Sequence, residues 1–251
     1  MFASKHHPEI LYVASALALL PRLPKDAQLV TGESEYTLLA SAVRSRQVDL
    51  AIQRFLSQNP EGAVINLGCG LETIAQRNGN GKTRWFSLDL PEVIALRETL
   101  IVPCAYEEHL AFSMFDPAWI ERVKSPSKGP YLVIASGLFY YFDTQSVMAL
   151  MRSLFGFGEA TLVFDAVSSF GMRGTKHYMK KMGKTDAEML FSLDHADALA
   201  RSISTRSKVL DERMMFDVVL RKNSLKWITW WSMRISDRFK MVKVITLRER
   251  Q

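Results

Sequence analysis

The sequence predicts an α/β protein with a mostly parallel sheet covered by helices on both faces. Two observations predict this class: short apolar runs alternate with amphipathic runs along the chain, and the run from Tyr131 to Ala135 is apolar throughout. Strands that alternate with helices form parallel sheets, whose central strands are buried on both faces. With 251 residues, of which 48% are hydrophobic, the chain is expected to form a single domain.

The N-terminal residues 1–60 are predicted to form a helical cover. The apolar stretch from Ile10 to Leu20 has helical spacing, is closed by Pro21 and is too short to span a bilayer. We expect it to pack on the core or to cap a pocket. A second helix is predicted from Glu33 to Gln58, where apolar residues recur at helical intervals, and it ends at the turn residues Asn59 to Gly62.

Residues 63–167 are predicted to form the core of the sheet and to carry the cofactor site. The predicted strands are Ala63 to Leu67, Arg84 to Leu88, Tyr131 to Ala135 and Thr161 to Phe164. The predicted helices are Leu71 to Arg77, Glu92 to Leu100, Pro117 to Lys124 and Thr144 to Leu154. The composition of Asn78 to Gly81 predicts a loop.

The last third of the chain departs from this alternation. Residues 168–208 are predicted to form a helical insertion after the carboxyl end of a strand, where a lid over a substrate can form. In the closing part, residues 209–251, the runs Met214 to Leu220 and Met241 to Leu247 are predicted to be an antiparallel hairpin. Helical spacing favours core or lid packing, over base stacking, for three tryptophans between these runs: Trp227, Trp230 and Trp231.

Charge and cysteine content restrict the partners and the compartment. The net charge is +6, but basic and acidic residues are interspersed, so a nucleic-acid partner is not expected. Cys69 and Cys104 form no disulfide framework and lack a His or Cys at metal-ligand spacing, which indicates a reducing compartment and no metal. No convincing cleavage site follows the N-terminal apolar stretch, so we expect a cytoplasmic protein with no membrane partner.

The most informative motif is a glycine turn that follows an apolar strand. Gly68 and Gly70 can adopt backbone angles forbidden to other residues and let a ligand lie against the main chain. The next predicted strand is followed directly by Asp89, nineteen residues after Gly70. This is close to the spacing at which a carboxylate binds the ribose hydroxyls of a nucleotide. The motif therefore predicts a site for the adenosine part of a cofactor.

The residues after the turn favour S-adenosylmethionine over a dinucleotide. Thr73 stands where the dinucleotide fingerprint has its third glycine. A carboxylate at Glu72 would compete with a pyrophosphate for the positive end of the following helix, but it would not repel a cationic sulfonium. The alternative is an NAD-dependent oxidoreductase, and Glu72 and Thr73 make this alternative less favourable.

Further motifs occur in order along the chain, and with them it resembles the leucine carboxyl methyltransferase family, especially the bacterial branch of polyketide O-methyltransferases. The likeness runs from about Tyr36 to about Leu199. It rests on these segments: Arg44 to Asp49, Ile65 to Thr73 with Arg77, Phe86 to Pro91, Ser113 to Trp119, Ser136 to Phe142 and Leu162 to Asp165.

The resemblance implies a class I methyltransferase fold with a seven-stranded sheet, which binds S-adenosylmethionine and methylates a carboxyl or hydroxyl oxygen of a small molecule. It implies that Arg44 pairs with the methionine carboxylate, as a guanidinium fork is suited to do. Asp89 would accept both ribose hydroxyls, and Asp116 the adenine amino group. The implied cofactor site comprises Arg44, Gly68, Cys69, Gly70, Asp89, Leu90, Phe115, Asp116 and Ser136. Asp116 also suits a helix N-cap before Pro117.

Two residues depart from the family pattern. Glu72 stands where the family usually has aspartate, which is a mild change. Ser136 stands where the family commonly has a glutamate beside the sulfonium. The serine would alter the electrostatics or the substrate contacts and leave the cofactor cleft intact, which puts activity on the family's best-known substrates in question.

The acceptor decides whether a base is needed. A carboxylate acceptor needs none, whereas a phenol or alcohol must lose a proton, and the candidates for that role are His177, His195, Tyr140 and Tyr141. We place Tyr141 near the acceptor as the candidate catalytic residue. The alternatives are a tRNA-modifying methyltransferase of the same family and a catalytically inactive S-adenosylmethionine-binding relative. The sequence predicts neither the acceptor nor the oligomeric state.

Overall fold

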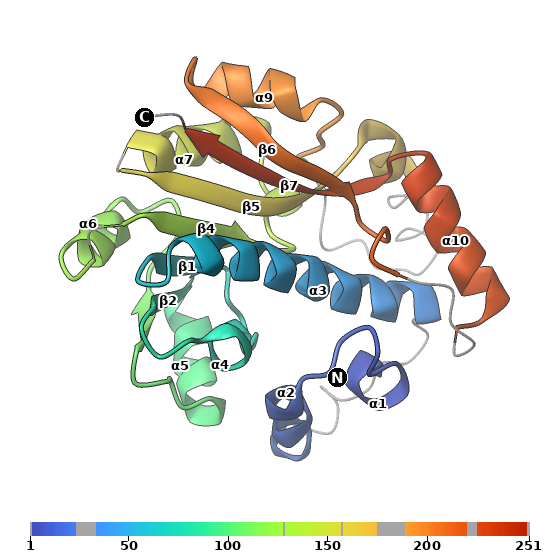
Figure 1. Cartoon of the computed structure of the whole chain (residues 1–251), viewed down its shortest axis with the longest axis horizontal. Coiled ribbons are helices and arrows are strands. Elements are labelled where there is room, and N and C mark those ends of the chain that lie inside the picture. Colours follow the sequence, from blue (N-terminus) through green and yellow to red (C-terminus); the bar gives the residue numbers. More distant parts are fainter. Residues whose placement is uncertain are drawn as a thin grey trace.

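The computed structural model describes residues 2–23, 34–127, 129–156, 158–174, 189–219 and 225–249. Their centre is a seven-stranded sheet with the order β3-β2-β1-β4-β5-β7-β6 (Figure 1). Strands β1 to β5 are parallel, and β7 runs antiparallel to both of its neighbours. The predicted α/β class with a mostly parallel sheet is therefore confirmed.

The strands are β1 Ala63–Leu67, β2 Arg84–Asp89, β3 Glu107–Ala111, β4 Tyr131–Ala135, β5 Ala160–Val167, β6 Ser207–Met214 and β7 Val242–Glu249. The helices are α1 Phe2–His6, α2 Ala14–Leu19, α3 Glu35–Gln58, α4 Ile74–Asn78, α5 Pro91–Leu100, α6 Ala118–Lys124, α7 Thr144–Gly156, α9 Ala196–Ile203 and α10 Trp227–Arg238. Short 3₁₀ turns lie at Leu20–Arg22 and Phe139–Tyr141.

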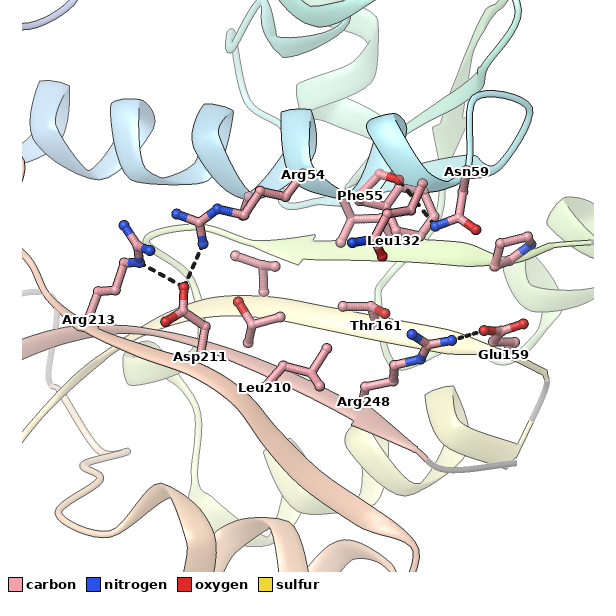
Figure 2. A pocket seen from close by; sticks show the side chains of 15 residues that line it. Arg54, Phe55, Asn59, Leu132, Glu159, Thr161, Leu210, Asp211, Arg213 and Arg248 are labelled. Carbon is pink, nitrogen blue, oxygen red and sulfur yellow. Dashed lines mark hydrogen bonds and ion pairs between the residues drawn. The ribbon is translucent and has the colours of Figure 1, made fainter.

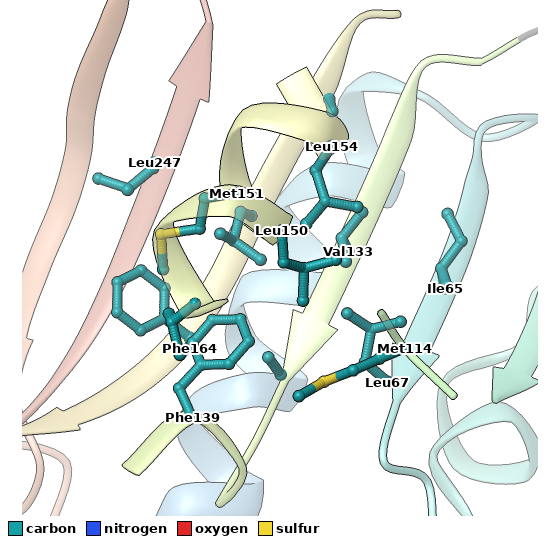
Figure 3. Packing of buried hydrophobic residues seen from close by; sticks show 14 of the residues in the cluster. Ile65, Leu67, Met114, Val133, Phe139, Leu150, Met151, Leu154, Phe164 and Leu247 are labelled. Atoms are coloured by element: carbon teal, nitrogen blue, oxygen red, sulfur yellow. The ribbon is translucent and has the colours of Figure 1, made fainter. Parts of the chain in front are cut away.

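The two faces of the sheet bury separate apolar clusters. Along β4, Val133 packs in the cluster that includes α6, α7 and α9, while Leu132 and Ile134 pack in the cluster that includes α3. Figure 3 shows the first cluster, in which side chains of α7 lie against β4 and β5. A strand buried on both faces needs apolar residues at every position, which explains the unbroken apolar run of β4.

The two edge strands were not predicted correctly. Strand β3 was missed because Glu107, Glu108 and His109 resemble a polar loop. The last hairpin was placed too far along the chain: β6 is Ser207–Met214, and the apolar residues after it are buried in turns. Edge strands pair on one side only and tolerate polar residues, so hydrophobicity identifies them poorly.

The N-terminal segment lines a pocket, as expected, but its helix is shorter than the apolar pattern predicts. Helix α2 covers only Ala14–Leu19 of the predicted stretch. Leu11, Val13 and Ala16 line a cavity of about 300 Å³ together with residues of α3 and of the turn after β1. The Ser15 hydroxyl donates a hydrogen bond of 2.8 Å to Thr73 in that turn.

The described ends of the predicted insertion return to the sheet. Directly after β5, the backbone N–H of Ser168 donates to the carbonyl of Met241 at 2.9 Å, and further along, the N–H of Leu190 donates to the carbonyl of Tyr140 at 2.7 Å. Helix α9 follows and packs its apolar face on α7 and β6. His177, one of the candidate bases, lies outside the described residues.

The packing prediction for the tryptophans is wrong at two of the three positions. All three lie on α10, where Trp227 and Trp231 are exposed and Trp230 is half-buried. Helical spacing alone could not distinguish the buried face of α10 from its exposed face, because the exposed face carries the aromatic residues.

None of the helices within the described ranges has both the length and the apolar character needed to cross a bilayer.

Candidate functional site

The predicted site residues lie along one edge of the sheet. Register pairs Leu67 of β1 with Leu88 of β2 and with Ala135 of β4. Ala135 pairs in turn with Phe164 of β5, and Asp89 with Ala111 of β3. The turns that follow the five parallel strands therefore meet at their carboxyl ends, where open α/β sheets bind ligands.

The glycine turn and Asp89 form the centre of this edge. Gly68 and Gly70 have φ angles of +62° and +46°, in the left-handed region. The carboxylate of Asp89 accepts two backbone hydrogen bonds of 2.8 Å. Its Oδ2 accepts the N–H of Gly70, and its Oδ1 accepts the N–H of the next residue, Leu90. A Cβ on Gly70 would meet no atom within 4 Å, so the turn borders open space on this side.

Arg97 of α5 holds the glycine turn from behind, and the sequence analysis gave it no role. Its Nη1 donates to the carbonyls of Gly70 and Glu72 at 2.9 and 2.8 Å. Its Nη2 pairs with Glu107 at 3.0 Å, and Nε donates to Nε2 of His109 at 3.0 Å. Arg97 and Glu107 are almost fully buried, so this ion pair on β3 positions the turn backbone.

A second network joins α3 to the turn after β4 and to the end of β5. Nη1 of Arg44 donates to the hydroxyl of Tyr140 at 3.0 Å and lies 3.6 Å from Oδ2 of Asp165. Oδ1 of Asp165 accepts the N–H of Gly137 at 2.5 Å. Burial lowers the pKa of Arg44, but the charge of Asp165 and the contact with Tyr140 raise it overall, so the guanidinium remains charged.

Asp165 belongs to one of the motifs on which the family resemblance rests, Leu162 to Asp165, but the sequence predicted no role for it. Asp165 is buried inside the sheet near the end of β5. A buried carboxylate needs hydrogen-bond donors or a cation, and the N–H of Gly137 and the guanidinium of Arg44 provide them. Its partner on α3 is distant in sequence, so no local pattern could identify the contact.

Glu72 is neutralised by neighbours, which changes the argument drawn from its charge. It accepts hydrogen bonds from Ser45 and from Arg77, both at 3.0 Å. Burial raises the pKa of Glu72, but the charge of Arg77 and the hydrogen bonds from Arg77 and Ser45 together lower it overall. Arg77 also binds both oxygens of Asp49 at 3.0 and 2.8 Å. The carboxylate of Glu72 is thus paired, and its repulsion of a pyrophosphate is weaker than the sequence suggested.

The other predicted cofactor residues lie nearer the surface. Leu90 and Phe115 are exposed, and the Phe115 ring contacts Phe142 edge-on with centroids 5.1 Å apart. Oδ1 of Asp116 accepts the N–H of Ala118, the first residue of α6, at 2.9 Å. The N-cap position itself is Pro117, one residue later than predicted. Ser136 is half-buried in the turn after β4.

The candidate bases differ in burial from one another, and the cofactor-site residue Cys69 is buried. Tyr141 is exposed and its ring packs edge-on against Tyr140, with centroids 4.7 Å apart. Burial raises the pKa of Tyr140, more than the nearby Arg44 lowers it. Burial likewise raises the pKa of Cys69 to about 12, so its thiol is inert. His195 is exposed at the start of α9.

A separate groove of about 350 Å³ lies on the α3 face of the sheet, away from the carboxyl edge (Figure 2). Its charged residues are paired: Asp211 accepts from Arg54 and Arg213 at 2.6 and 2.7 Å, and Glu159 pairs with Arg248. Every charged side chain that lines this groove is therefore already bound to another one. Across the described ranges, no cluster of three or more His, Cys, Asp or Glu side chains could hold a metal ion.

Solved structures of other proteins share this architecture. A DUF574 family protein from Streptomyces avermitilis aligns over 99% of this chain and 97% of its own, with a TM-score of 0.62 and 13% identity. A putative methyltransferase from Thermobifida fusca aligns over 95% and 88%, with a TM-score of 0.61 and 15% identity. These likenesses confirm the expected class I methyltransferase fold.

Two curated proteins are similar in sequence. The tetracenomycin polyketide synthesis O-methyltransferase TcmP of Streptomyces glaucescens is 29% identical over 171 residues, which is 67% of this chain and 62% of that protein. The S-adenosyl-L-methionine-dependent methyltransferase dpfgK of Gibberella zeae is 30% identical over 131 residues, or 49% and 43% of the two chains. The aligned region therefore spans less than two thirds of either relative.

The chain also matches a protein family over more than half of its length. Residues 22–155 match the family described as leucine carboxyl methyltransferase. This range contains the glycine turn, Asp89, Asp116 and the turn after β4, which are the parts from which the carboxyl edge is built. On this match, the chain belongs to the leucine carboxyl methyltransferase family.

Proposed function

We propose that the protein is an S-adenosylmethionine-dependent O-methyltransferase that acts on a carboxyl or hydroxyl group of a small molecule. The observation that carries the proposal is the position of Asp89 at the carboxyl edge, where it accepts a hydrogen bond from the glycine turn. The chain's membership of the leucine carboxyl methyltransferase family supports the same cofactor. The two sequence relatives are both named as methyltransferases, which supports the same reaction class. The two free cysteines suit a reducing compartment such as the cytoplasm, which we propose as the location.

The residues present fit this cofactor. Each carboxylate oxygen of Asp89 accepts one backbone N–H and retains a lone pair, which suits two ribose hydroxyls. The open space beside Gly70 lets a ligand approach the main chain. Arg44 uses Nη1 for its contacts with Tyr140 and Asp165, and its remaining donors suit a carboxylate. Cys69, Leu90, Phe115, Asp116 and Ser136 complete the proposed cofactor site.

S-adenosylmethionine, when bound, supplies a methyl group already activated by the sulfonium. The protein then has to orient the acceptor oxygen and exclude water. Tyr140 is unsuited to act as a base, because burial raises the pKa of its phenol and its oxygen accepts from Arg44. Tyr141 is exposed at the same edge, and we assign it to the acceptor side of the site. A carboxylate acceptor would need no base.

We assign residues 1–60 to a cover and residues 168–208 to a lid within a single domain. The cavity between α2, α3 and the glycine-turn region supports the first assignment. The hydrogen bond between Leu190 and Tyr140 supports the second, because it returns the insertion to the carboxyl edge. Ser136, in place of the family's glutamate, supports a second candidate, namely a relative that binds the cofactor and transfers no methyl group.

The first test is calorimetric titration of the purified protein with S-adenosylhomocysteine, beside Asp89→Ala and an Asp116→Ala variant. We expect micromolar binding that Asp89→Ala weakens at least about a hundredfold, because two charge-assisted hydrogen bonds are lost. A parent protein that binds no S-adenosylhomocysteine would refute the proposal. Binding without turnover across carboxylate, phenol and tRNA acceptors would support the inactive relative, and turnover of tRNA alone would replace the small-molecule acceptor.

A further inference from the structure

Helix α10 carries its apolar side chains on the surface. Its exposed large apolar residues are between 50% and 72% exposed: Trp227, Ile228, Trp231 and Ile235. At 3.6 residues per turn these positions occupy one side of the helix. We call these four residues, with Phe239 directly after the helix, the aromatic face.

The opposite side of α10 is buried and largely polar. Its buried residues are Thr229, Met233, Ser236 and Asp237. Thr229 donates to Glu35 at 2.5 Å, and Asp237 accepts the N–H of Phe216 at 3.0 Å. A surface helix of a water-soluble domain normally buries its apolar side and exposes its polar side. The arrangement of α10 is inverted, so its aromatic face is built for contact with something other than water.

The charges around the aromatic face have one sign. Lys226, Arg234, Arg238 and Lys240 are exposed on or next to α10. Asp237, the only acidic residue of the helix, is on the buried side. Arg234 and Arg238 lie on the same side of the helix as Trp227 and Trp231, because three, seven or eleven residues separate them.

A second element enlarges the aromatic face. Phe170, just after β5, is 53% exposed, and its ring lies 5.7 Å from that of Phe239 between centroids. The start of β7 pairs with the end of β5 at Val167, so α10 leads into the carboxyl edge of the sheet (Figure 1). The aromatic face therefore borders the edge that holds the candidate site.

We propose that the aromatic face of α10 docks on the surface of an anionic lipid bilayer. Tryptophan prefers the interface between headgroups and acyl chains, and arginine or lysine beside it pairs with anionic headgroups. An amphipathic helix that lies in the interface combines these two features. A second copy of this chain fits less well, because a two-fold contact between aromatic faces would bring the same four cations together. The inference concerns binding and holds with or without methyl transfer.

Flotation with lipid vesicles tests the proposal on the whole chain. We expect binding to phosphatidylcholine vesicles in which about a third of the lipid is phosphatidylglycerol, and little binding to phosphatidylcholine alone. The double variant Trp227→Ser with Trp231→Ser should lower the partition coefficient at least about tenfold, since two interfacial anchors are lost. Arg234→Glu with Arg238→Glu should lower it about tenfold or more, and salt near about 0.5 M should weaken the parent's binding.

Matched controls separate the aromatic face from general stickiness. Leu96→Ser with Val102→Ser removes two apolar side chains that are 52% and 83% exposed on another surface, and should not alter vesicle binding. Arg122→Glu with Arg201→Glu changes the net charge equally on other exposed helices. Failure of the parent to float, equal binding to both vesicle types, or equal losses in variants and controls would overturn the proposal. The proposal would also be overturned if the parent protein bound no vesicles and sedimented as a dimer that only the tryptophan variant converted to monomers.

Discussion

Gly137 shows how a single residue can hold the candidate site together. Its φ is +69°, and its N–H donates to Asp165 at 2.5 Å. A Cβ at this position would come within 2.8 Å of Cζ of Arg44. Two separate features therefore require glycine at this position: the left-handed backbone and the close approach of the Arg44 guanidinium.

Replacing Gly137 by alanine should displace Arg44 and weaken the binding of S-adenosylhomocysteine about tenfold or more, because the guanidinium would no longer face the site. The free energy of unfolding should fall by about 1 to 2 kcal/mol from backbone strain. Calorimetric titration and urea unfolding measure these two effects.

Gly156 provides the control for that variant. It ends α7, and a Cβ there would meet no atom within 4 Å. Gly156→Ala should leave ligand binding unchanged and stabilise the protein by up to about 1 kcal/mol. If Gly137→Ala bound the ligand as the parent does, Arg44 could not be held in place by the space that Gly137 leaves.

At the scale of elements, β3 and α5 support the glycine turn through buried charges. Glu107 of β3 accepts from Ser87 of β2 at 2.7 Å and from Arg97 of α5 at 3.0 Å. Arg97 then reaches the carbonyls of the turn. A polar edge strand thus fixes the backbone that borders the proposed cofactor, which is why it does not carry the usual apolar residues.

The same cluster predicts a pH dependence of stability. Burial and the charge of Arg97 both lower the pKa of His109 in the folded protein. The unfolded chain binds a proton at this side chain below about pH 6.5, while the folded protein resists it. The contribution of neutral His109 to the free energy of unfolding is therefore complete above about pH 6.5, and it is lost as the pH falls below that value.

Urea unfolding between about pH 5 and pH 7.5 checks this expectation. The free energy of unfolding of the parent should decrease towards acid by up to about 1.4 kcal/mol per pH unit. In His109→Gln, which keeps a hydrogen-bonding side chain and cannot titrate, the decrease should be smaller. The same slope in both proteins would show that other groups cause the acid sensitivity.

For the whole molecule, the proposed cofactor site joins α3 to the carboxyl ends of four parallel strands, β1 to β4. Ligand binding should therefore stabilise the entire fold. At about one hundred times its dissociation constant, S-adenosylhomocysteine should raise the free energy of unfolding by about 2.7 kcal/mol. Thermal unfolding with and without the ligand measures this as an increase in Tm.

NADH gives the discriminating control for that measurement. Because Arg77 neutralises Glu72, electrostatic repulsion alone does not exclude a dinucleotide from the turn. We expect no change in Tm with NADH, since Thr73 occupies the position of the third fingerprint glycine. An increase with NADH and none with S-adenosylhomocysteine would instead indicate an oxidoreductase.

The predictability of each element followed from its burial. The buried strands β1, β2, β4 and β5 were predicted because an element covered on both faces must be apolar. Strand β3 was not, because its charges are satisfied by Arg97, which lies in the preceding helix and meets them only after folding. For α10 the pattern misled, because two of its large aromatic side chains face outwards.

The sequence by itself determined the class of fold, the glycine turn and Asp89, because these depend on local pattern: apolar runs, glycine conformation and the spacing between consecutive strands. Only the tertiary structure decided the partners of Arg44 and Glu72, the support that Arg97 gives to the turn, and the outward aromatic face of α10. These depend on which side chains meet across the sheet and its helices. Such contacts are set by packing between segments distant in sequence, and no local pattern encodes them.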